Sequence, residues 1–261
     1  MTIFKHELRQ GRKSFIIWTA AIMFLLAVCV FLYPEMKAEM DSINELFSSM
    51  GSFTAAFGMD KLNVGTLIGF YSVECGSILG LGGAFFAALC AVDLLCKEER
   101  MQTSEFLLTH PLSRVKIMTG KFLSVICRIF EMNIAIFLIV LVSIAAIGEP
   151  IPLTELILIH VAYLLLTLEI AGICFGVSAF IRRGSIGIGL GISAILYILN
   201  LISNIAEPAE FLRYITPFAY CEGSQIISDG SLDLPKILIG FLIAGACVAA
   251  AYLTYPKKNI H

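Results

Sequence analysis

Long apolar runs alternate with shorter polar segments along almost the whole chain. Each of six runs has about 20 residues or more, the length that a helix needs to cross the hydrocarbon core of a bilayer. The pattern therefore predicts an all-α integral membrane protein, organised as a single transmembrane domain over residues 1–261. We expect the six spans at about residues 14–33, 68–95, 122–147, 153–181, 185–205 and 237–255.

The segment before the first span is short, basic and amphipathic. Its apolar residues recur at three- and four-residue spacing, while its basic residues occupy the other faces of a helix. This pattern predicts an interfacial helix that lies in the headgroup plane before the chain enters the bilayer. The first span is longer than the roughly 7–15 residues of a signal-peptide core, so we expect it to be retained. The apolar positions are Phe4, Leu8, Gly11 and Phe15, and the basic positions are Lys5, Arg9, Arg12 and Lys13.

A charged segment, residues 97–121, separates the second and third spans, and we call it the hinge. Its first part, Glu98–Thr109, is expected to be helical. Pro111 ends this helix, because the proline ring removes an N–H and disfavours helical geometry at the residue before it. Ser113 can cap a further helix that continues into the third span. The hinge is thus expected to project from the membrane as two helices joined by a tight turn, a shape suited to docking onto a soluble partner.

The placement of Lys and Arg predicts the orientation of the chain. If the N-terminus is cytoplasmic, thirteen of the eighteen basic residues fall in cytoplasmic segments, four in external segments, and Arg128 within a span. Cytoplasmic loops of membrane proteins retain an excess of Lys and Arg. We therefore expect both termini and the hinge to lie in the cytoplasm.

Composition supports a membrane protein and argues against a metal or disulfide framework. The chain is 58% hydrophobic and 15% charged, whereas soluble domains are about 45–50% apolar and about 25% charged. Six of its eight cysteines lie in apolar runs, Cys221 lies in an external loop, and no C-x-x-C occurs. The four histidines are scattered. We therefore expect no metal site and interpret the cysteines as small packing residues.

Sequence motifs for catalysis or nucleotide binding are missing or incomplete. Gly120-Lys121 is followed by Phe122, so the phosphate-binding pattern G-x-x-x-x-G-K-[ST] fails. Glu98-Glu99 lacks the arginine three residues later that an intramembrane prenyl-type protease needs, and no G-x-S-x-G motif occurs. We expect no catalytic residue, no directly bound cofactor and no nucleic-acid partner.

Four ionisable residues lie deep within the predicted spans. Such residues are costly in a bilayer and usually face the protein interior. Arg128 and Glu131 are three residues apart and can pair on one helical face. Two interpretations stay open: the four line a translocation path, or they form an intramembrane ion pair together with acids near the outer interface. They are Glu74, Arg128, Glu131 and Glu169.

Glycines four residues apart mark positions where neighbouring helices can approach closely. The run Gly187-Ile-Gly-Leu-Gly191 mimics part of a dinucleotide-binding motif, but it lies in an apolar span with no preceding strand, so helix packing is the better interpretation. The predicted packing residues are Gly76, Gly80, Gly172, Gly176, Gly187 and Gly191.

The hinge sequence EERMQTSEFLLTHPLSRVKIMTGK, between the second and third of six spans, resembles the permeases of ATP-binding-cassette type-2 exporters. In that family the segment reads roughly as two acids, a Thr, a Glu, a Leu pair, Pro, Ser-Arg and Gly-Lys. A weaker similarity is Leu212–Phe218 in the last external loop, where Thr216 replaces the serine of an aromatic-Ser-Pro-Phe pattern. The matching hinge residues are Glu98, Glu99, Thr103, Glu105, Leu107, Leu108, Pro111, Ser113, Arg114, Gly120 and Lys121.

The resemblance implies a permease subunit that hydrolyses nothing itself. It would pair with a second permease, identical or related, and with two cytoplasmic ATPase subunits that bind ATP and magnesium. The hinge would be the coupling helix, and the spans would form an export path through the cell membrane of a bacterium or archaeon for a substrate such as an antimicrobial peptide, a drug or an ion. The residues implied in ATPase coupling are Glu98, Glu99, Thr103, Glu105, Pro111, Ser113 and Arg114.

Three alternatives remain at the level of sequence. A secondary transporter would act without an ATPase, but such folds usually show internal repeats, and none is convincing here. A membrane-embedded enzyme would need a nucleophile or metal cluster. A structural membrane partner would transport nothing.

Overall fold

The computed structural model describes residues 2–38, 51, 54, 56, 62, 63, 65–95, 97, 113–181 and 186–257. Within this part of the chain the regular elements are helices, and six are long and apolar enough to cross a membrane. The all-α prediction with six spans is therefore confirmed. The spans are Arg12–Ala38 (α2), Leu67–Val92 (α5, a π-helical turn and α6), Arg114–Ala146 (α9), Leu153–Phe180 (α10), Ile186–Ile205 (α11) and Leu234–Lys257 (α13 and a final 3-10 turn).

Two helices are longer than their predicted spans. α2 continues through Pro34 to Ala38, although we expected the span to end at residue 33. α9 begins at Arg114, before the span predicted from residue 122, and Ser113 caps it as the sequence predicts. The 33 residues of α9 correspond to about 50 Å of helix, well beyond the roughly 30 Å of hydrocarbon core.

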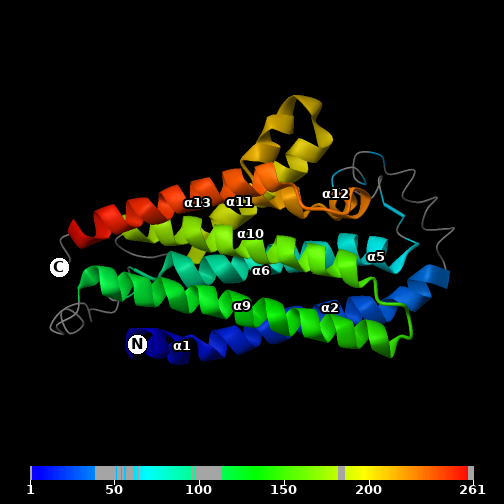
Figure 1. Cartoon of the computed structure of the whole chain (residues 1–261), viewed down its shortest axis with the longest axis horizontal. Coiled ribbons are helices and arrows are strands. Elements are labelled where there is room, and N and C mark those ends of the chain that lie inside the picture. The colour runs from blue at the N-terminus through cyan, green and yellow to red at the C-terminus, as the bar shows by residue number, and fades with distance from the viewer. Residues whose placement is uncertain are drawn as a thin grey trace.

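The spans run along one another as a bundle with α10 at its centre (Figure 1). α10 packs along both α6 and α13, whereas α2 packs along α9 and α11 along α6. The helix α1 (Thr2–Gln10) contacts α9. In Figure 1, α1, the end of α13 and the start of α9 lie at one end of the bundle, which we call the α1 end. The helix α12 (Gly223–Asp229) lies toward the other, the α12 end.

A short insert follows α11 at the α12 end, and only its second part is buried. It consists of two 3-10 helices, η3 (Glu207–Tyr214) and η4 (Pro217–Cys221). All five residues of η4 are buried, and η4 contacts α10, α11 and α13. Its aromatic and apolar residues are therefore covered by protein.

The second span contains a local change in helical winding. Tyr71–Cys75 (η2) form a π-helical turn between α5 (Leu67–Phe70) and α6 (Gly76–Val92). Such turns shift the faces that residues before and after them present, and they are frequent at functional sites. Here the turn directs Ser72 and Val73 into a cavity described below.

Candidate functional site

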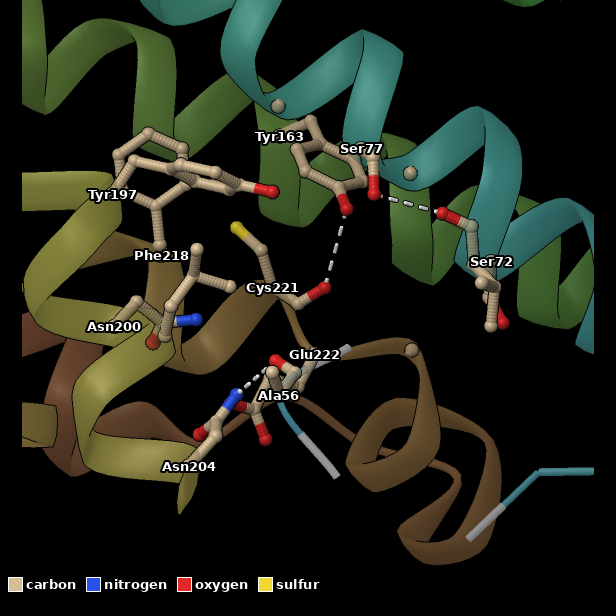
Figure 2. Close-up of a pocket in the computed structure, with 15 residues that line it drawn as sticks. Ala56, Ser72, Ser77, Tyr163, Tyr197, Asn200, Asn204, Phe218, Cys221 and Glu222 are labelled. Carbon is tan, nitrogen blue, oxygen red and sulfur yellow. Dashed lines mark hydrogen bonds between the residues drawn. The ribbon is translucent and has the colours of Figure 1, made fainter. Parts of the chain in front are cut away.

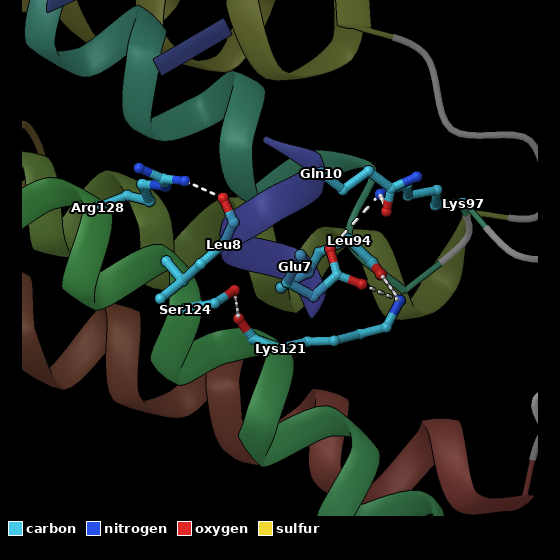
Figure 3. A network of polar contacts seen from close by, with 8 residues as sticks. All are labelled: Glu7, Leu8, Gln10, Leu94, Lys97, Lys121, Ser124 and Arg128. Carbon is cyan, nitrogen blue, oxygen red and sulfur yellow. Dashed lines mark hydrogen bonds and ion pairs between the residues drawn. The ribbon is translucent and has the colours of Figure 1, made fainter. Parts of the chain in front are cut away.

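A cluster of charges at the α1 end joins both ends of the hinge to α1 (Figure 3). The carboxylate of Glu7 lies 3.4 Å from the ammonium of Lys97 and 3.7 Å from that of Lys121. Lys97 also donates to the side chain of Gln10, and Lys121, which is 1% exposed, donates to the Leu94 carbonyl at 2.7 Å. One acidic residue thus faces a lysine at each end of the hinge.

The Gly-Lys pair at the end of the hinge has a structural explanation. A Cβ atom at Gly120 would lie 3.5 Å from Cγ2 of Ile3, so the glycine lets α1 approach α9 closely. The next residue, Lys121, then reaches Glu7 on the same helix. Neither residue contributes to a phosphate-binding loop in this arrangement.

The final residues of the hinge fix the start of α9. Ser113 accepts a hydrogen bond from the backbone N–H of Lys116 at 3.3 Å, as expected of an N-cap. Arg114 donates to the carbonyl of Pro256 at 3.3 Å, which ties α9 to the end of α13. The other predicted coupling residues lie outside the described residues: Glu98, Glu99, Thr103, Glu105 and Pro111.

Arg128 and Glu131 lie side by side on α9. Their charged groups are 3.1 Å apart, and the Arg128 guanidinium also donates to the carbonyl of Leu8 and lies 4.5 Å from the centre of the Phe15 ring. Arg128 therefore points toward α1 and the start of α2. It lines a cavity of about 340 Å³ at the α1 end, together with Glu7, Ser14, Asp93 and Lys97.

Glu74 and Glu169 lie in different surroundings from this pair. Glu74, in the π-helical turn, is exposed. Glu169, near the middle of α10, is 0% exposed, and neither carboxylate oxygen has a hydrogen-bond partner among the described residues. The hydroxyl of Tyr220 on η4 is likewise buried without a hydrogen-bond partner among the described residues. The four predicted intramembrane residues therefore do not converge on one site in the described structure.

The glycines form two kinds of close contact. Gly172 and Gly176 lie against α13, where a Cβ at Gly176 would be 2.7 Å from the Cys247 carbonyl oxygen. Gly76 and Gly80 instead accommodate the ring of Tyr163, whose hydroxyl would be 2.7 Å from a Cβ at Gly76.

The prediction for α11 needs a correction. Gly187 is exposed, and a Cβ at Gly191 would meet nothing within 4 Å. The intervening Gly189 makes the contact, since its Cβ would lie 2.9 Å from Cγ1 of Val92 on α6. Of the three glycines at alternate positions, only Gly189 faces the neighbouring helix, and the glycine spacing does not distinguish it from the other two.

A polar cavity of about 70 Å³ lies at the α12 end (Figure 2). It is lined by residues of the second span, α10, α11, η4 and the start of α12 and by Ala56, and it opens toward the protein surface. Tyr163 donates to the Cys221 carbonyl at 3.4 Å within it. Its polar side chains include Ser72, Ser77, Tyr163, Tyr197, Asn200, Asn204 and Glu222.

The Thr-Pro-Phe sequence forms one wall of this cavity. The Thr216 hydroxyl donates to the Leu196 carbonyl at 2.8 Å and accepts from the Phe218 N–H at 3.3 Å, so it caps η4 and fastens it to α11. Phe218 packs edge to face against Tyr197, with ring centres 5.3 Å apart. These contacts hold the Thr-Pro-Phe sequence in the protein interior.

Comparison with known families decides the class of this protein. The model of the ABC-2 family transporter protein matches residues 1–258. The chain belongs to the ABC-2 transporter family. A search of curated proteins gave no match. As an ABC-2 permease, it is a multi-pass membrane subunit for transport rather than an enzyme, and the family implies an ABC transporter with a partner ATPase.

Two groups of residues in this ABC-2 permease were missed by sequence reasoning. Glu7 is a single acid in a basic segment, and no periodic signal pairs it with lysines 90 and 114 residues away. Asn200 and Glu222 are polar residues near the ends of different elements, and only the tertiary fold brings them to one cavity. One side-chain oxygen of each is buried and has no hydrogen-bond partner among the described residues, which is the signal that the structure adds.

Proposed function

We propose that this chain is the permease subunit of an ABC exporter, and that its hinge transmits the closure of two cytoplasmic ATPase subunits to the spans. The observation that carries the proposal is the Glu7 cluster. Because Glu7 faces lysines at both ends of the hinge, a displacement of the hinge is communicated to α1, α6 and α9 together. α9 continues this connection as one uninterrupted helix.

The orientation in this proposal has both termini and the hinge in the cytoplasm. The excess of Lys and Arg in the N-terminal segment, the hinge, the segment between the fourth and fifth spans and the C-terminal segment supports it. Alkaline phosphatase fused after Gly58 should be active, since the enzyme requires an external location, and a fusion after Met101 should be inactive. Activity of the fusion after Met101 would reverse the orientation.

A complete exporter would contain a second permease, identical or related. The spans α2, α11 and α13 support this arrangement, because they carry many exposed large apolar residues, including Phe24, Ile195 and Leu242. These faces are available to lipid and to a second permease. The substrate would cross between the spans toward the outside.

The decisive experiment co-expresses the chain with a cytoplasmic ABC ATPase subunit of the same organism and reconstitutes both in proteoliposomes. The double substitution Glu98→Lys and Glu99→Lys should abolish association with the ATPase while the permease remains in the membrane, because charged contacts fix partner choice. The matched control, Glu35→Lys with Asp229→Lys, makes the same charge change at exposed positions outside the hinge and should leave association intact.

Two outcomes would contradict the proposal. One is equal association of the ATPase with both double variants. The other is ATP-independent export by the purified permease without an ATPase, which would favour a secondary transporter.

A further inference from the structure

The cavity at the α12 end contains buried oxygen atoms that the described structure leaves without partners. Oδ1 of Asn200 and Oε1 of Glu222 are both buried and accept no hydrogen bond from the described residues. Asn200 itself is only 7% exposed. Buried polar atoms are nearly always paired, since leaving one unpaired costs free energy. These two oxygens therefore indicate a group that the cavity receives.

The hydroxyl groups around the cavity present further acceptors. Ser72 donates to the carbonyl of Gly69 at 2.9 Å, Ser77 donates to the carbonyl of Val73 at 3.0 Å, and Tyr163 donates to the Cys221 carbonyl. A hydroxyl has one proton and two lone pairs. With the proton committed to a carbonyl, each of these oxygens keeps lone pairs, and all three residues line the cavity.

The charge of the cavity favours a cation with a single positive charge. Glu222 is the one acid among the described lining residues, and none of them is basic. Arg213 approaches from outside the cavity, but its guanidinium faces Asn204 at 3.3 Å and Glu210 at 3.6 Å. One carboxylate together with neutral oxygens matches the coordination preference of a hard cation for oxygen ligands.

The size of the cavity sets a second limit on its occupant. A volume of about 70 Å³ is several times the 10–15 Å³ that one water needs by this measure, but it is too small for a drug-sized molecule. The close approach of α12 to the π-helical turn keeps it small, since a Cβ at Gly223 would lie 2.7 Å from the Ser72 hydroxyl.

We propose that this cavity binds one small monovalent cation, of the size of Na⁺ or K⁺, through the oxygens of Glu222 and Asn200. The cation joins the start of α12 to α11 and so holds the segment after α11 against the spans. This site lies away from the Glu7 cluster and does not depend on the proposed coupling to an ATPase.

The test measures cation binding by the purified permease in detergent. Equilibrium binding of radioactive Na⁺ should saturate, and unlabelled Na⁺ or K⁺ should displace the tracer. Thermal unfolding in NaCl or KCl should occur at a higher temperature than in N-methylglucamine chloride at the same ionic strength, since a ligand that binds only the folded state stabilises it.

Variants assign the binding to the cavity. Glu222→Gln should weaken Na⁺ binding at least tenfold, and Asn200→Ala should weaken it several-fold. Glu35→Gln makes the same charge change at an exposed position on α2, outside the cavity lining, and should bind as the wild type does. If Glu222→Gln fails to fold, Na⁺ binding is measured with the same tracer in Asn200→Ala and Ser77→Ala, and both variants should bind Na⁺ more weakly than the wild type.

Three results would overturn the proposal. The first is equal thermal stability in the metal-ion and N-methylglucamine salts, which would mean that water alone fills the cavity. The second is unchanged Na⁺ affinity in the folded Asn200→Ala and Glu222→Gln variants. The third is displacement of the tracer by Ca²⁺ at a lower concentration than by any monovalent ion, which would contradict a site specific for a cation with a single positive charge.

Discussion

The backbone of Gly240 on α13 lies directly against the carboxyl group of Glu169 on α10. A Cβ atom added at residue 240 would overlap Oε2 and lie 2.6 Å from Cδ. Glu169 is completely buried, so its carboxyl group cannot swing into solvent to make room. The missing side chain at position 240 is therefore what allows α13 to pack here against a glutamate.

This contact predicts a specific energetic coupling. Gly240→Ala should destabilise the protein by about 1–3 kcal/mol, because the added methyl overpacks the contact. In a Glu169→Ala background the same change should cost much less, since the carboxyl group is gone. Unfolding of the two single variants and the double variant in detergent gives the coupling energy.

Gly245 on the same helix provides the control for this cycle. A Cβ there would meet nothing within 4 Å, so Gly245→Ala should be neutral or slightly stabilising. Additive effects of Gly240→Ala and Glu169→Ala would show that the two residues do not meet.

The Glu7 cluster predicts that α1 loosens when its acid is removed. Glu7→Ala takes one carboxylate away from the buried ammonium of Lys121, and we expect a loss of stability on the order of 1–3 kcal/mol. Hydrogen exchange of the backbone amides of α1 should become faster. Lys5→Ala changes an exposed charge on the same helix and should leave the exchange unchanged. Equal exchange in both variants would mean that Glu7 does not anchor α1.

Asp233 predicts a pH dependence of stability at acidic pH. Burial raises the pKa of this carboxyl, but hydrogen bonds from the Lys236 side chain and backbone N–H outweigh it, so the pKa is lowered overall. A lowered folded-state pKa contributes stability above the ordinary Asp value of about 3.9 and loses it as the pH falls through the folded value. Asp233→Ala should therefore be less stable than the wild type at pH 7, with the difference shrinking toward pH 3.

Asp233→Asn separates the cap of α13 from the ion pair. Asparagine caps helices about as well as aspartate, so this variant should keep most of the stability at pH 7 and lack the acidic titration. Parallel thermal unfolding of the wild type and both variants between pH 7 and pH 3 measures this. A constant difference between the wild type and Asp233→Ala over that range would contradict the pKa shift.

Thr216 predicts a difference between two conservative substitutions. Thr216→Val keeps the shape but loses the hydrogen bonds to Leu196 and Phe218, which leaves the buried Phe218 N–H without this acceptor and should cost about 1–3 kcal/mol. Thr216→Ser keeps the hydroxyl and should remain close to the wild type. Thermal unfolding of both variants checks this, and equal loss in the two would mean that the methyl group, not the hydroxyl, matters.

The sequence predicts the number and approximate place of the helices because the bilayer imposes a minimum length on each apolar run. It predicts helix ends less well. α2 continues through Pro34, beyond the end predicted for the first span, whereas the start of α9 at Arg114 follows the cap predicted at Ser113. Neither extension changes the apolar pattern from which the spans were predicted.

The sites depend on which side chains meet, and periodicity does not determine this. Gly189 rather than Gly187 or Gly191 faces α6, since the rotation of α11 about its axis depends on its tertiary contacts. The burial of η4 is a similar case. Its apolar composition does not determine that α10, α11 and α13 are the elements that cover it. The hinge residues Glu98 and Glu99 were identified by resemblance, and their role stays a prediction.

The length of α9 has a mechanical consequence. A rigid rod of about 50 Å that pivots by about 5° at one end carries its other end through about 4 Å. If α9 rotates as a unit, a shift of that size where it joins the hinge becomes a tilt across the full thickness of the bilayer. Small movements at the α1 end are thereby sufficient to rearrange the surfaces between the spans.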